Sequence, residues 1–345
     1  MTKFGFFHSS CLPLLHKVAI MLSVLVSLLF LTACPKNDKL QPPRVGVSES
    51  TASPVMPGPV AFNGERAMDH ARKQVEIGPR PPGSEALART REYIVSNLKG
   101  SGLSVTTDDF NASTPVGAKQ MSNITAELPG ESKEVIMIAS HYDTKLYDDM
   151  HFVGANDPAA SVGTLLEIGR VLGASQQKPA FTYWLVFFDG EEAFCESWDE
   201  CSKPGAPDNT YGSRHYVSQL QGRNELGRVG AMILLDMMGY KKLELGRDTL
   251  SARWLQDIIW QTGRELGHGK IFVDRPEGVG GDDHEPFLRA GVHGVDIIQL
   301  SNYPYWHKAD DTLDKISAQS MKVVGDTVIT SLPRVEKYLQ SKGKK

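Results

Sequence analysis

The sequence has no strong excess of charge of either sign. Its 345 residues carry 37 Lys and Arg against 41 Asp and Glu, a formal net charge of -4, and no basic block stands outside the extreme termini. A protein that binds nucleic acid needs a basic surface to neutralise phosphates, so nucleic acid is excluded as a partner. The sequence also has no internal repeat and no second linker, which favours a single globular domain.

Cysteine is scarce, with four residues in the whole chain, and two of them lie in the N-terminal segment. The other two, Cys195 and Cys201, have no His nearby, and two thiolates alone do not make a zinc site. In an oxidising compartment such a closely spaced pair forms a small-loop disulfide. We therefore expect a Cys195–Cys201 disulfide, with a metal site as the weaker alternative.

Only one long apolar run is present, over residues 18–31, and it ends in the tetrapeptide Leu-Thr-Ala-Cys at Cys34. The run follows Lys3 and Lys17 and is short for a membrane span, so we expect residues 1–33 to be a cleaved export signal. The tetrapeptide resembles the lipobox of bacterial lipoproteins, which implies a lipidated Cys34. An uncleaved anchor helix is the alternative. Either would tether an exported protein to the periplasmic or cell-surface face of a membrane.

The composition changes again at about residue 60. Residues 34–60 are rich in Pro, Ser, Gly and Val and have little periodicity, which is typical of a flexible linker. A globular pattern then continues to residue 340, and residues 341–345 form a short basic tail. We expect one globular domain over 61–340.

Helical and strand patterns alternate within this domain. The strands are short, nearly continuous apolar runs of the kind found in sheets buried on both faces. Predicted strands lie at 123–128, 134–140, 182–188, 230–235 and 294–300, and predicted helices at 67–77, 84–98, 159–172, 211–219, 250–266 and 317–339. This order predicts a three-layer α/β/α sandwich with a mixed, mostly parallel central sheet.

Acidic and imidazole side chains follow the predicted strands, and one further acid opens a predicted helix. These residues are His141, Asp157, Glu191, Glu192, Asp236 and His307. Ligands bind at the carboxyl ends of the strands in open α/β sheets. A single acid there is usually a helix cap, but converging carboxylates repel one another unless a cation neutralises them. Two carboxylates and an imidazole with one open position are the ligands of a catalytic zinc site.

Six segments make a resemblance to a known family specific: FVGANDPAASVGTLLEIGRVL, LVFFDGEEAF, YGSRH, LLDMMG, DDHEPFL and YWHKADDTLD. Together and in this order they resemble the glutaminyl-peptide cyclotransferases, a branch of the M28 zinc aminopeptidase superfamily. The similarity runs from about residue 62 to the C-terminal helix, so it covers nearly all of the predicted domain.

The resemblance assigns roles to individual positions. It implies that Asp157, Glu192 and His307 bind zinc and that Glu191 is the general acid/base. It also implies that Asp236 and Asp282 form a hydrogen-bond network near the substrate, and that Trp306 and Trp198 line the substrate pocket. His284 is either an outer partner of the site or the cap of a turn.

The number of zinc ions stays open at this point. In the two-metal aminopeptidases, residues matching His141, Asp157 and Asp236 hold a second zinc, and the cyclases keep them while resembling one-zinc enzymes. The resemblance implies conversion of N-terminal Gln to pyroglutamate on peptide or protein N-termini. The alternative is a zinc aminopeptidase, which would use the same Glu191 to activate water.

Overall fold

The computed structural model describes residues 60–343. The predicted signal peptide, Cys34 and almost all of the predicted linker lie outside the described residues, as do residues 344–345. The last helix continues to Gly343, so residues 341–343 of the predicted basic tail belong to it. Between residues 60 and 343, none of the helices combines the length and the apolar character that crossing a membrane requires.

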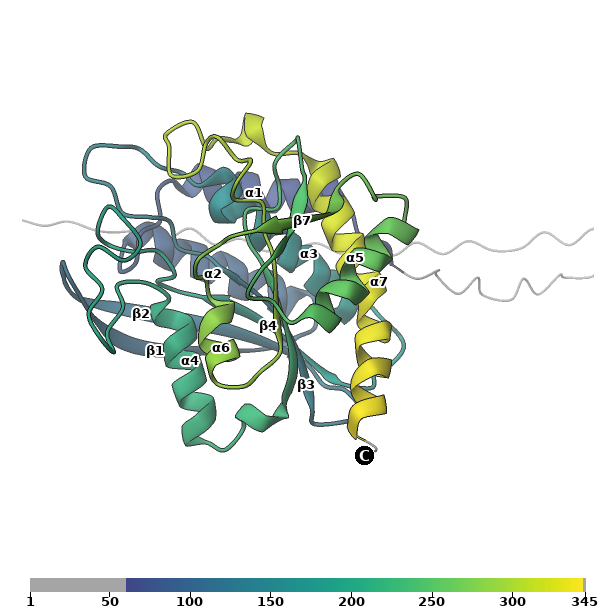
Figure 1. The fold of residues 1–345 in the computed structure, drawn as a ribbon. Coiled ribbons are helices and arrows are strands. Elements are labelled where there is room, and N and C mark those ends of the chain that lie inside the picture. Colours follow the sequence, from purple (N-terminus) through teal and green to yellow (C-terminus); the bar gives the residue numbers. More distant parts are fainter. Residues whose placement is uncertain (1–59, 344–345) are drawn as a thin grey trace, which may run out of the picture. The chain divides into compact units, whose positions relative to one another are not determined.

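A six-stranded mixed sheet forms the centre of the domain (Figure 1). Its strand order is β1-β2-β4-β3-β5-β8. The neighbours among β4, β3, β5 and β8 pair in parallel. At one edge of the sheet, β2 pairs antiparallel with β4 and β1 pairs antiparallel with β2. The strands are β1 (Ser104–Thr114), β2 (Gly117–Leu128), β3 (Val135–His141), β4 (Thr182–Phe188), β5 (Val229–Leu235) and β8 (Gly294–Ile297).

Alternate residues of the central strands enter two separate cores. In β3, Ile136 and Ile138 belong to one core and Val135 and Met137 to the other. This alternation follows from the two-residue period of a strand, which sends successive side chains to opposite faces. Because both faces are covered, the strand sequences are continuously apolar.

Helices cover both faces, which confirms the predicted three-layer sandwich (Figure 1). The larger core includes side chains from α1 (Gly64–Ile77), α2 (Glu85–Gly100), α3 (Ser161–Gly173), α5 (Arg253–Glu265) and α7 (Ala318–Gly343). The smaller core includes side chains from α4 (Tyr211–Gly222) and α6 (His284–Arg289).

Short elements complete the fold. A kinked helical turn, η1 (Ala155–Ala160), leads into α3, and two 3₁₀ turns are η2 (Leu226–Arg228) and η3 (Leu313–Lys315). A separate pair of parallel strands, β6 (Leu245–Asp248) and β7 (Phe272–Glu277), lies outside the main sheet.

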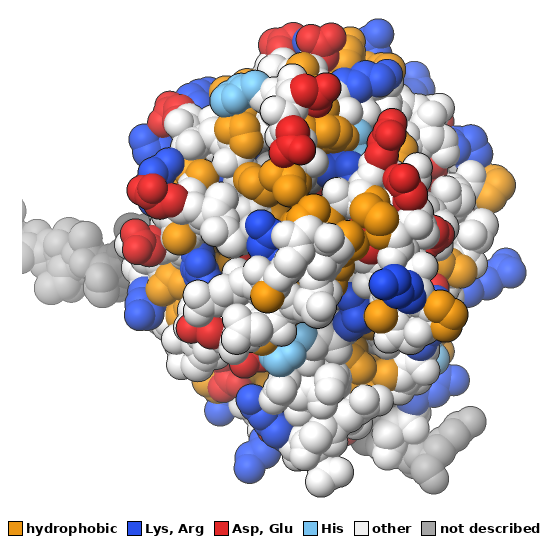
Figure 2. Space-filling model, turned by 90° about the vertical axis from the view of Figure 1, so that its left-hand side faces the viewer, with side chains coloured by type: hydrophobic (Ala, Val, Ile, Leu, Met, Phe, Trp, Pro, Cys, Tyr) orange, Lys and Arg blue, Asp and Glu red, His pale blue; other side chains and the backbone are white. Residues whose placement is uncertain are grey.

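The surface carries charges of both signs. On the face in Figure 2, Lys and Arg side chains are interspersed with Asp and Glu, and apolar side chains gather near the middle. No separate basic area is visible on this face.

Candidate active site

Three residues that are distant in the sequence meet at the carboxyl end of the sheet. Asp157 lies in η1, Glu192 in the loop after β4, and His307 in the loop after β8. The Nε2 atom of His307 lies 3.1 Å from Glu192 Oε2 and 3.5 Å from Asp157 Oδ2. One ligand atom from each of the three lies within 4.8 Å of the others, so they can contact one common ion.

The chemistry of this group fits a zinc ion. Two carboxylates and one imidazole are the ligands that zinc takes in catalytic sites, with a further position left open. Asp157 and Glu192 are each 3% exposed, and the Oε1 atom of Glu192 is buried without a hydrogen-bond partner. An ion bound there would compensate the two buried carboxylates.

A second group of potential ligands shares Asp157 with the first. The Nε2 atom of His141 lies 3.2 Å from Asp157 Oδ1 and 3.2 Å from Asp236 Oδ1. His141, Asp157 and Asp236 also place one ligand atom each within 4.8 Å of the others. The fold therefore provides overlapping places for one or two ions.

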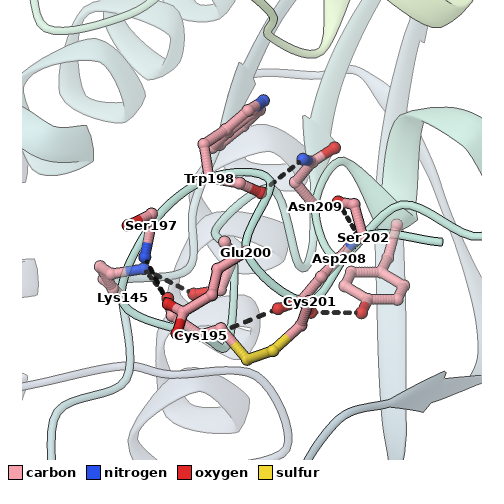
Figure 3. Close-up of a disulfide and its surroundings, with 11 residues drawn as sticks. Lys145, Cys195, Ser197, Trp198, Glu200, Cys201, Ser202, Asp208 and Asn209 are labelled. Atoms are coloured by element: carbon pink, nitrogen blue, oxygen red, sulfur yellow. Dashed lines mark hydrogen bonds between the residues drawn. A yellow bond between two sulfur atoms is a disulfide. The ribbon is translucent and has the colours of Figure 1, made fainter.

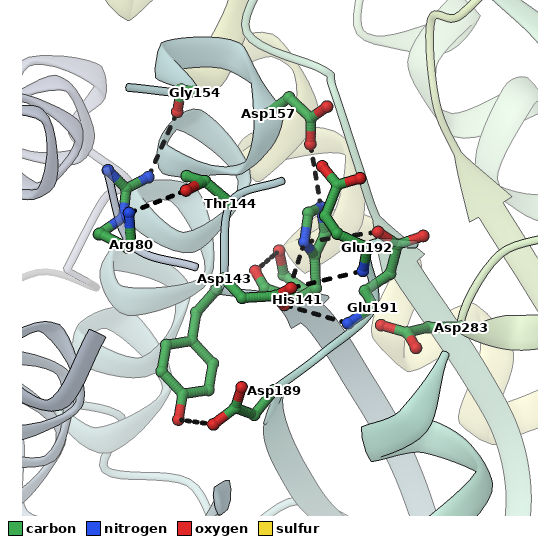
Figure 4. Close-up of polar contacts among 12 residues, drawn as sticks. Arg80, His141, Asp143, Thr144, Gly154, Asp157, Asp189, Glu191, Glu192 and Asp283 are labelled. Atoms are coloured by element: carbon green, nitrogen blue, oxygen red, sulfur yellow. Dashed lines mark hydrogen bonds and ion pairs between the residues drawn. The ribbon is translucent and has the colours of Figure 1, made fainter. Parts of the chain in front are cut away.

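A tight turn after β4 directs Glu191 and Glu192 (Figure 4). Gly190 has φ +73°, and a Cβ atom there would lie 2.6 Å from the sulfur of Met121. The backbone amides of Glu191 and Glu192 donate hydrogen bonds to the two carboxylate oxygens of Asp143, at 3.1 and 3.4 Å. Asp143 thus fixes the backbone of both glutamates, a role that the sequence analysis did not predict.

Burial and neighbouring charges shift the pKa values of the acids. Burial raises the pKa of Glu191 well above its ordinary value, and repulsion from Glu192 adds to the effect while His141 opposes it. Burial also raises the pKa of Asp236 to about 7, and it raises the pKa of Asp282. Burial opposes ionisation of Asp157 too, but its hydrogen bond and attraction to His141 lower its pKa overall.

A pocket of about 280 Å³ opens onto these groups. Its polar lining includes all the residues predicted for catalysis and for the first zinc ion. Its apolar lining includes Met237, Val279, Ile298 and Leu300. The lining residues that were predicted from the sequence are Asp157, Glu191, Glu192, Trp198, Asp236, Asp282, Trp306 and His307. Trp306 is 41% exposed and its ring stacks on that of His307, with centroids 4.3 Å apart.

The other predicted aromatic residue, Trp198, lies on a cross-linked loop (Figure 3). Cys195 and Cys201 form a disulfide in the structure. The Nζ atom of Lys145 donates hydrogen bonds to the carbonyl oxygens of Ala193 and Cys195, at 2.7 and 2.8 Å. These bonds and the disulfide hold the loop against the pocket.

Asp311 is a further supporting residue that the sequence analysis did not single out. Its carboxylate accepts hydrogen bonds from the backbone amides of Asn156 and Asp157, at 2.9 and 3.1 Å, and from the hydroxyl of Tyr303. Asp311 therefore fixes the turn that carries Asp157, one of the predicted zinc ligands. The signal was present, because Asp311 is the second Asp of the segment YWHKADDTLD.

Known proteins are similar to this chain in sequence and in fold. The family model for peptidase family M28 matches residues 123–332. Bovine glutaminyl-peptide cyclotransferase is 31% identical over 270 residues, which cover 69% of this chain and 73% of the bovine protein.

Two solved structures are similar as well. The crystal structure of Acidobacteriales bacterium glutaminyl cyclase has a TM-score of 0.75 and 35% identity, covering 83% of this chain and 99% of that one. A leucine aminopeptidase precursor from Bacteroides thetaiotaomicron has a TM-score of 0.72 and 28% identity, covering 79% of this chain and 98% of that one. From the matched family and these relatives, the chain belongs to peptidase family M28 and, within it, to the glutaminyl-peptide cyclotransferase branch.

Proposed function

We propose that the domain is a zinc-dependent glutaminyl-peptide cyclotransferase, which converts the N-terminal Gln of peptides to pyroglutamate and releases ammonia. The observation that carries this proposal is the single pocket in which Glu191 lies beside the group Asp157, Glu192 and His307. The 31% identical bovine relative and the 35% identical bacterial structure, both named for this activity, support it.

The reaction is intramolecular. The α-amine nitrogen of the substrate Gln forms a bond to its side-chain carbonyl carbon, and the bond from that carbon to the amide nitrogen breaks. A pocket that holds the Gln in a bent conformer converts binding energy into rate, because it removes the entropy cost of bringing the two groups together. Trp306 and Trp198 are the aromatic walls we assign to this task.

We assign proton transfer to Glu191. Its carboxylate takes the proton that the attacking amine loses and delivers it to the departing nitrogen, so that ammonia leaves as a neutral molecule. Asp236 and Asp282 line the same pocket and are 6% and 2% exposed. Two such buried acids share a proton more readily than both ionise, so one of them can donate a hydrogen bond to the reacting nitrogen.

Asp157, Glu192 and His307 are the residues we assign to zinc. When bound, zinc supplies Lewis-acid polarisation of a carbonyl oxygen. Asp143 and Asp311 act indirectly, by holding the backbone on which Glu191, Glu192 and Asp157 stand.

Two peptides of equal length, one beginning with Gln and the other with Leu, distinguish the candidate reactions. The similar leucine aminopeptidase precursor makes N-terminal hydrolysis the second candidate. We expect the zinc-loaded protein to release ammonia and pyroglutamyl peptide from the first and nothing from the second. Release of free leucine would establish an aminopeptidase instead, and no product at verified zinc occupancy would refute both.

The location of the enzyme is a further part of the proposal. The N-terminal apolar run and the Leu-Thr-Ala-Cys sequence ending at Cys34 support export and lipid anchoring, which would place the domain at the periplasmic or cell-surface face of a membrane. Its substrates would then be the N-termini of peptides and proteins outside the cytoplasm.

A further inference from the structure

A second pocket lies beside the catalytic one and has no part in the proposed reaction. Its volume is about 300 Å³, and the two pockets share Trp198, Asp199 and Gly280 in their linings. The rest of its lining comes mainly from the segment before α4, from α4 and from α6. We call it the side pocket, and the lining residues that matter here are Trp198, Asp199, Asn209, Arg214, Ser218 and Glu285.

Trp198 borders both pockets and is held in place. Its backbone carbonyl accepts a hydrogen bond from the side-chain amide of Asn209 at 3.1 Å (Figure 3). A Cβ atom at Gly281 would lie 3.0 Å from the indole nitrogen of Trp198, so the ring packs closely on this backbone. A peptide whose N-terminal Gln lies in the catalytic pocket therefore passes Trp198 and meets the side pocket next.

Arg214 supplies a fixed positive charge to the side pocket. Its Nε and Nη2 atoms donate hydrogen bonds to the backbone carbonyl oxygen of Asn209, at 3.2 and 2.9 Å, and Nη2 donates to that of Pro207 at 2.9 Å. The guanidinium also lies over the ring of Tyr211, 4.9 Å from its centroid. Among residues 60–343 no carboxylate forms an ion pair with it, and Nη1 donates no hydrogen bond. Nη1 is thus the end that can bind a carboxylate of a ligand.

The other charges of the side pocket need no ligand. Glu285 accepts a hydrogen bond from Arg289 at 2.7 Å, so these two charges compensate each other. Asp199 is exposed, and water and salt screen its charge. Arg214 is half-buried, and its burial lowers the pKa of the guanidinium. A charge that has lost water without gaining a partner favours an acidic ligand over a neutral or basic one.

The geometry of an extended peptide indicates which substrate residue reaches this charge. Successive side chains of an extended chain point to opposite sides, so the first and the third side chains point to the same side, roughly 7 Å apart. When the first side chain enters the catalytic pocket, the third faces the neighbouring side pocket. The second side chain points away from both.

We propose that the side pocket binds the third residue of the substrate peptide and that Arg214 selects an acidic side chain, Asp or Glu, at that position. This inference rests on the proposed function, because it places the N-terminal Gln in the catalytic pocket. The contact is remote from the reacting atoms and is the same in the ground state and the transition state. It therefore lowers KM and leaves kcat nearly unchanged.

Three tetrapeptides with amidated C-termini test the preference on the full-length, zinc-loaded protein. They are Gln-Ala-Glu-Ala, its neutral counterpart Gln-Ala-Gln-Ala, and the isomer Gln-Glu-Ala-Ala, which has the same composition and charge as the first. We expect KM for Gln-Ala-Glu-Ala to be about tenfold below that of the neutral peptide, because a hydrogen bond to a charged group contributes that much. The isomer should show no such gain.

Variants on α4 test whether Arg214 is responsible. Arg214→Gln should abolish the tenfold preference, but Arg214 also holds the backbone at Pro207 and Asn209. Ser218→Glu leaves those bonds in place. Ser218 is exposed, lies one helical turn after Arg214 and lines the side pocket, so its new carboxylate pairs with Arg214 and should abolish the preference too. Gln219→Glu adds the same charge at the next residue, which lines a different pocket, and should keep the preference.

Equal KM values for Gln-Ala-Glu-Ala and Gln-Ala-Gln-Ala in the wild type would overturn the side-pocket proposal and leave the cyclase proposal standing. A preference that persists in both Arg214→Gln and Ser218→Glu would overturn it as well. If no peptide yields pyroglutamate, the cyclase proposal fails, and calorimetric Kd values on the Glu191→Gln protein then decide. Binding of Gln-Ala-Glu-Ala about tenfold tighter than that of the neutral peptide supports the side pocket, and equal binding refutes it.

Discussion

Glu191 and Glu192 are adjacent residues to which we assign separate roles. Glu192 Oε2 lies 3.1 Å from His307 Nε2 in the zinc group, whereas Glu191 faces the pocket without belonging to that group. We expect Glu191→Gln to lower kcat by about 10²–10⁴-fold, because a positioned acid/base contributes that much. Bound zinc should stay at the wild-type level. Ammonia release and metal analysis on the same sample measure both, and near-normal turnover would contradict the assigned role.

Gly190 permits the turn that separates these two side chains. It has φ +73°, and a Cβ atom would meet the sulfur of Met121 at 2.6 Å. Gly190→Ala should therefore cost about 1–3 kcal/mol of the free energy of unfolding. The matched control is Gly227→Ala, whose new Cβ meets nothing within 4 Å. Urea unfolding compares the two variants, and an equal effect of both would show that the turn imposes no special constraint.

Sequence reasoning identified residues that stand at strand ends and missed those that act on backbone amides. Asp157, Glu192 and His307 were predictable because each follows an apolar run or opens a helix. Asp143 and Asp311 accept hydrogen bonds from backbone amides of the active-site turns, and spacing along the sequence does not reveal such bonds. Asp311 was marked only by its place in the segment YWHKADDTLD.

Asp296 was not predicted as a site residue, for a different reason. It lies inside the apolar run GVDIIQL, where the pattern predicts a buried strand and gives a single acid no assigned role. Its full burial beside Asp282 became visible only in the fold.

At the scale of elements, the buried strands were predictable and the exposed ones were not. The apolar runs at β3, β4 and β5 matched the structure closely. The edge strand β1 (Ser104–Thr114) was missed because its sequence, SVTTDDFNAST, is polar and most of it is exposed or half-buried. The β6–β7 pair was missed because β6 has only four residues and ends just before the helix predicted over 250–266.

The disulfide loop is the element that carries Trp198 into the pocket. Cys195 and Cys201 are six residues apart, and removing a cross-link over such a loop costs about 2 kcal/mol on the chain-entropy account. We expect the Cys195→Ser/Cys201→Ser variant to lose about that much stability and to show a raised KM with a smaller change in kcat. The reason is that a loosened Trp198 weakens binding more than chemistry.

Reducing agent provides the control for this variant. Dithiothreitol should reproduce the raised KM in the wild-type protein and leave the double variant unchanged. An unaltered KM in both would mean that the hydrogen bonds from Lys145 to the loop are sufficient to hold Trp198.

For the whole molecule, the order of the elements was enough to predict the architecture. Alternating helices and buried strands have few compact arrangements, and the three-layer sandwich is the one that covers both faces of the sheet. The family was predictable because six motifs occur in order, and its confirmation came from the match over residues 123–332. Ligand identity did not reveal the number of ions, because Asp157 belongs to two overlapping groups.

At the scale of the whole molecule, we expect the N-terminal segment to hold the protein at a membrane. The apolar run over residues 18–31 and the Leu-Thr-Ala-Cys sequence support anchoring through the N-terminal segment and Cys34. Two or more acyl chains bind a bilayer stably, whereas one chain binds only marginally. Wild-type protein made in a bacterial host should therefore partition into the detergent phase and have an N-terminus at lipidated Cys34 by mass spectrometry.

Two serine variants separate lipid anchoring from an uncleaved apolar helix. Cys34→Ser removes the proposed lipid site and should never yield the acylated mature N-terminus. Cys11→Ser changes a residue within the predicted signal, so its mature protein should be identical in mass to the wild type. If instead the wild type and both variants stay in the membrane fraction with residues 1–33 attached, the apolar run itself is the anchor. In either case the turnover of the detergent-solubilised protein should be equal in all three, because the pocket is built entirely from residues 157–307.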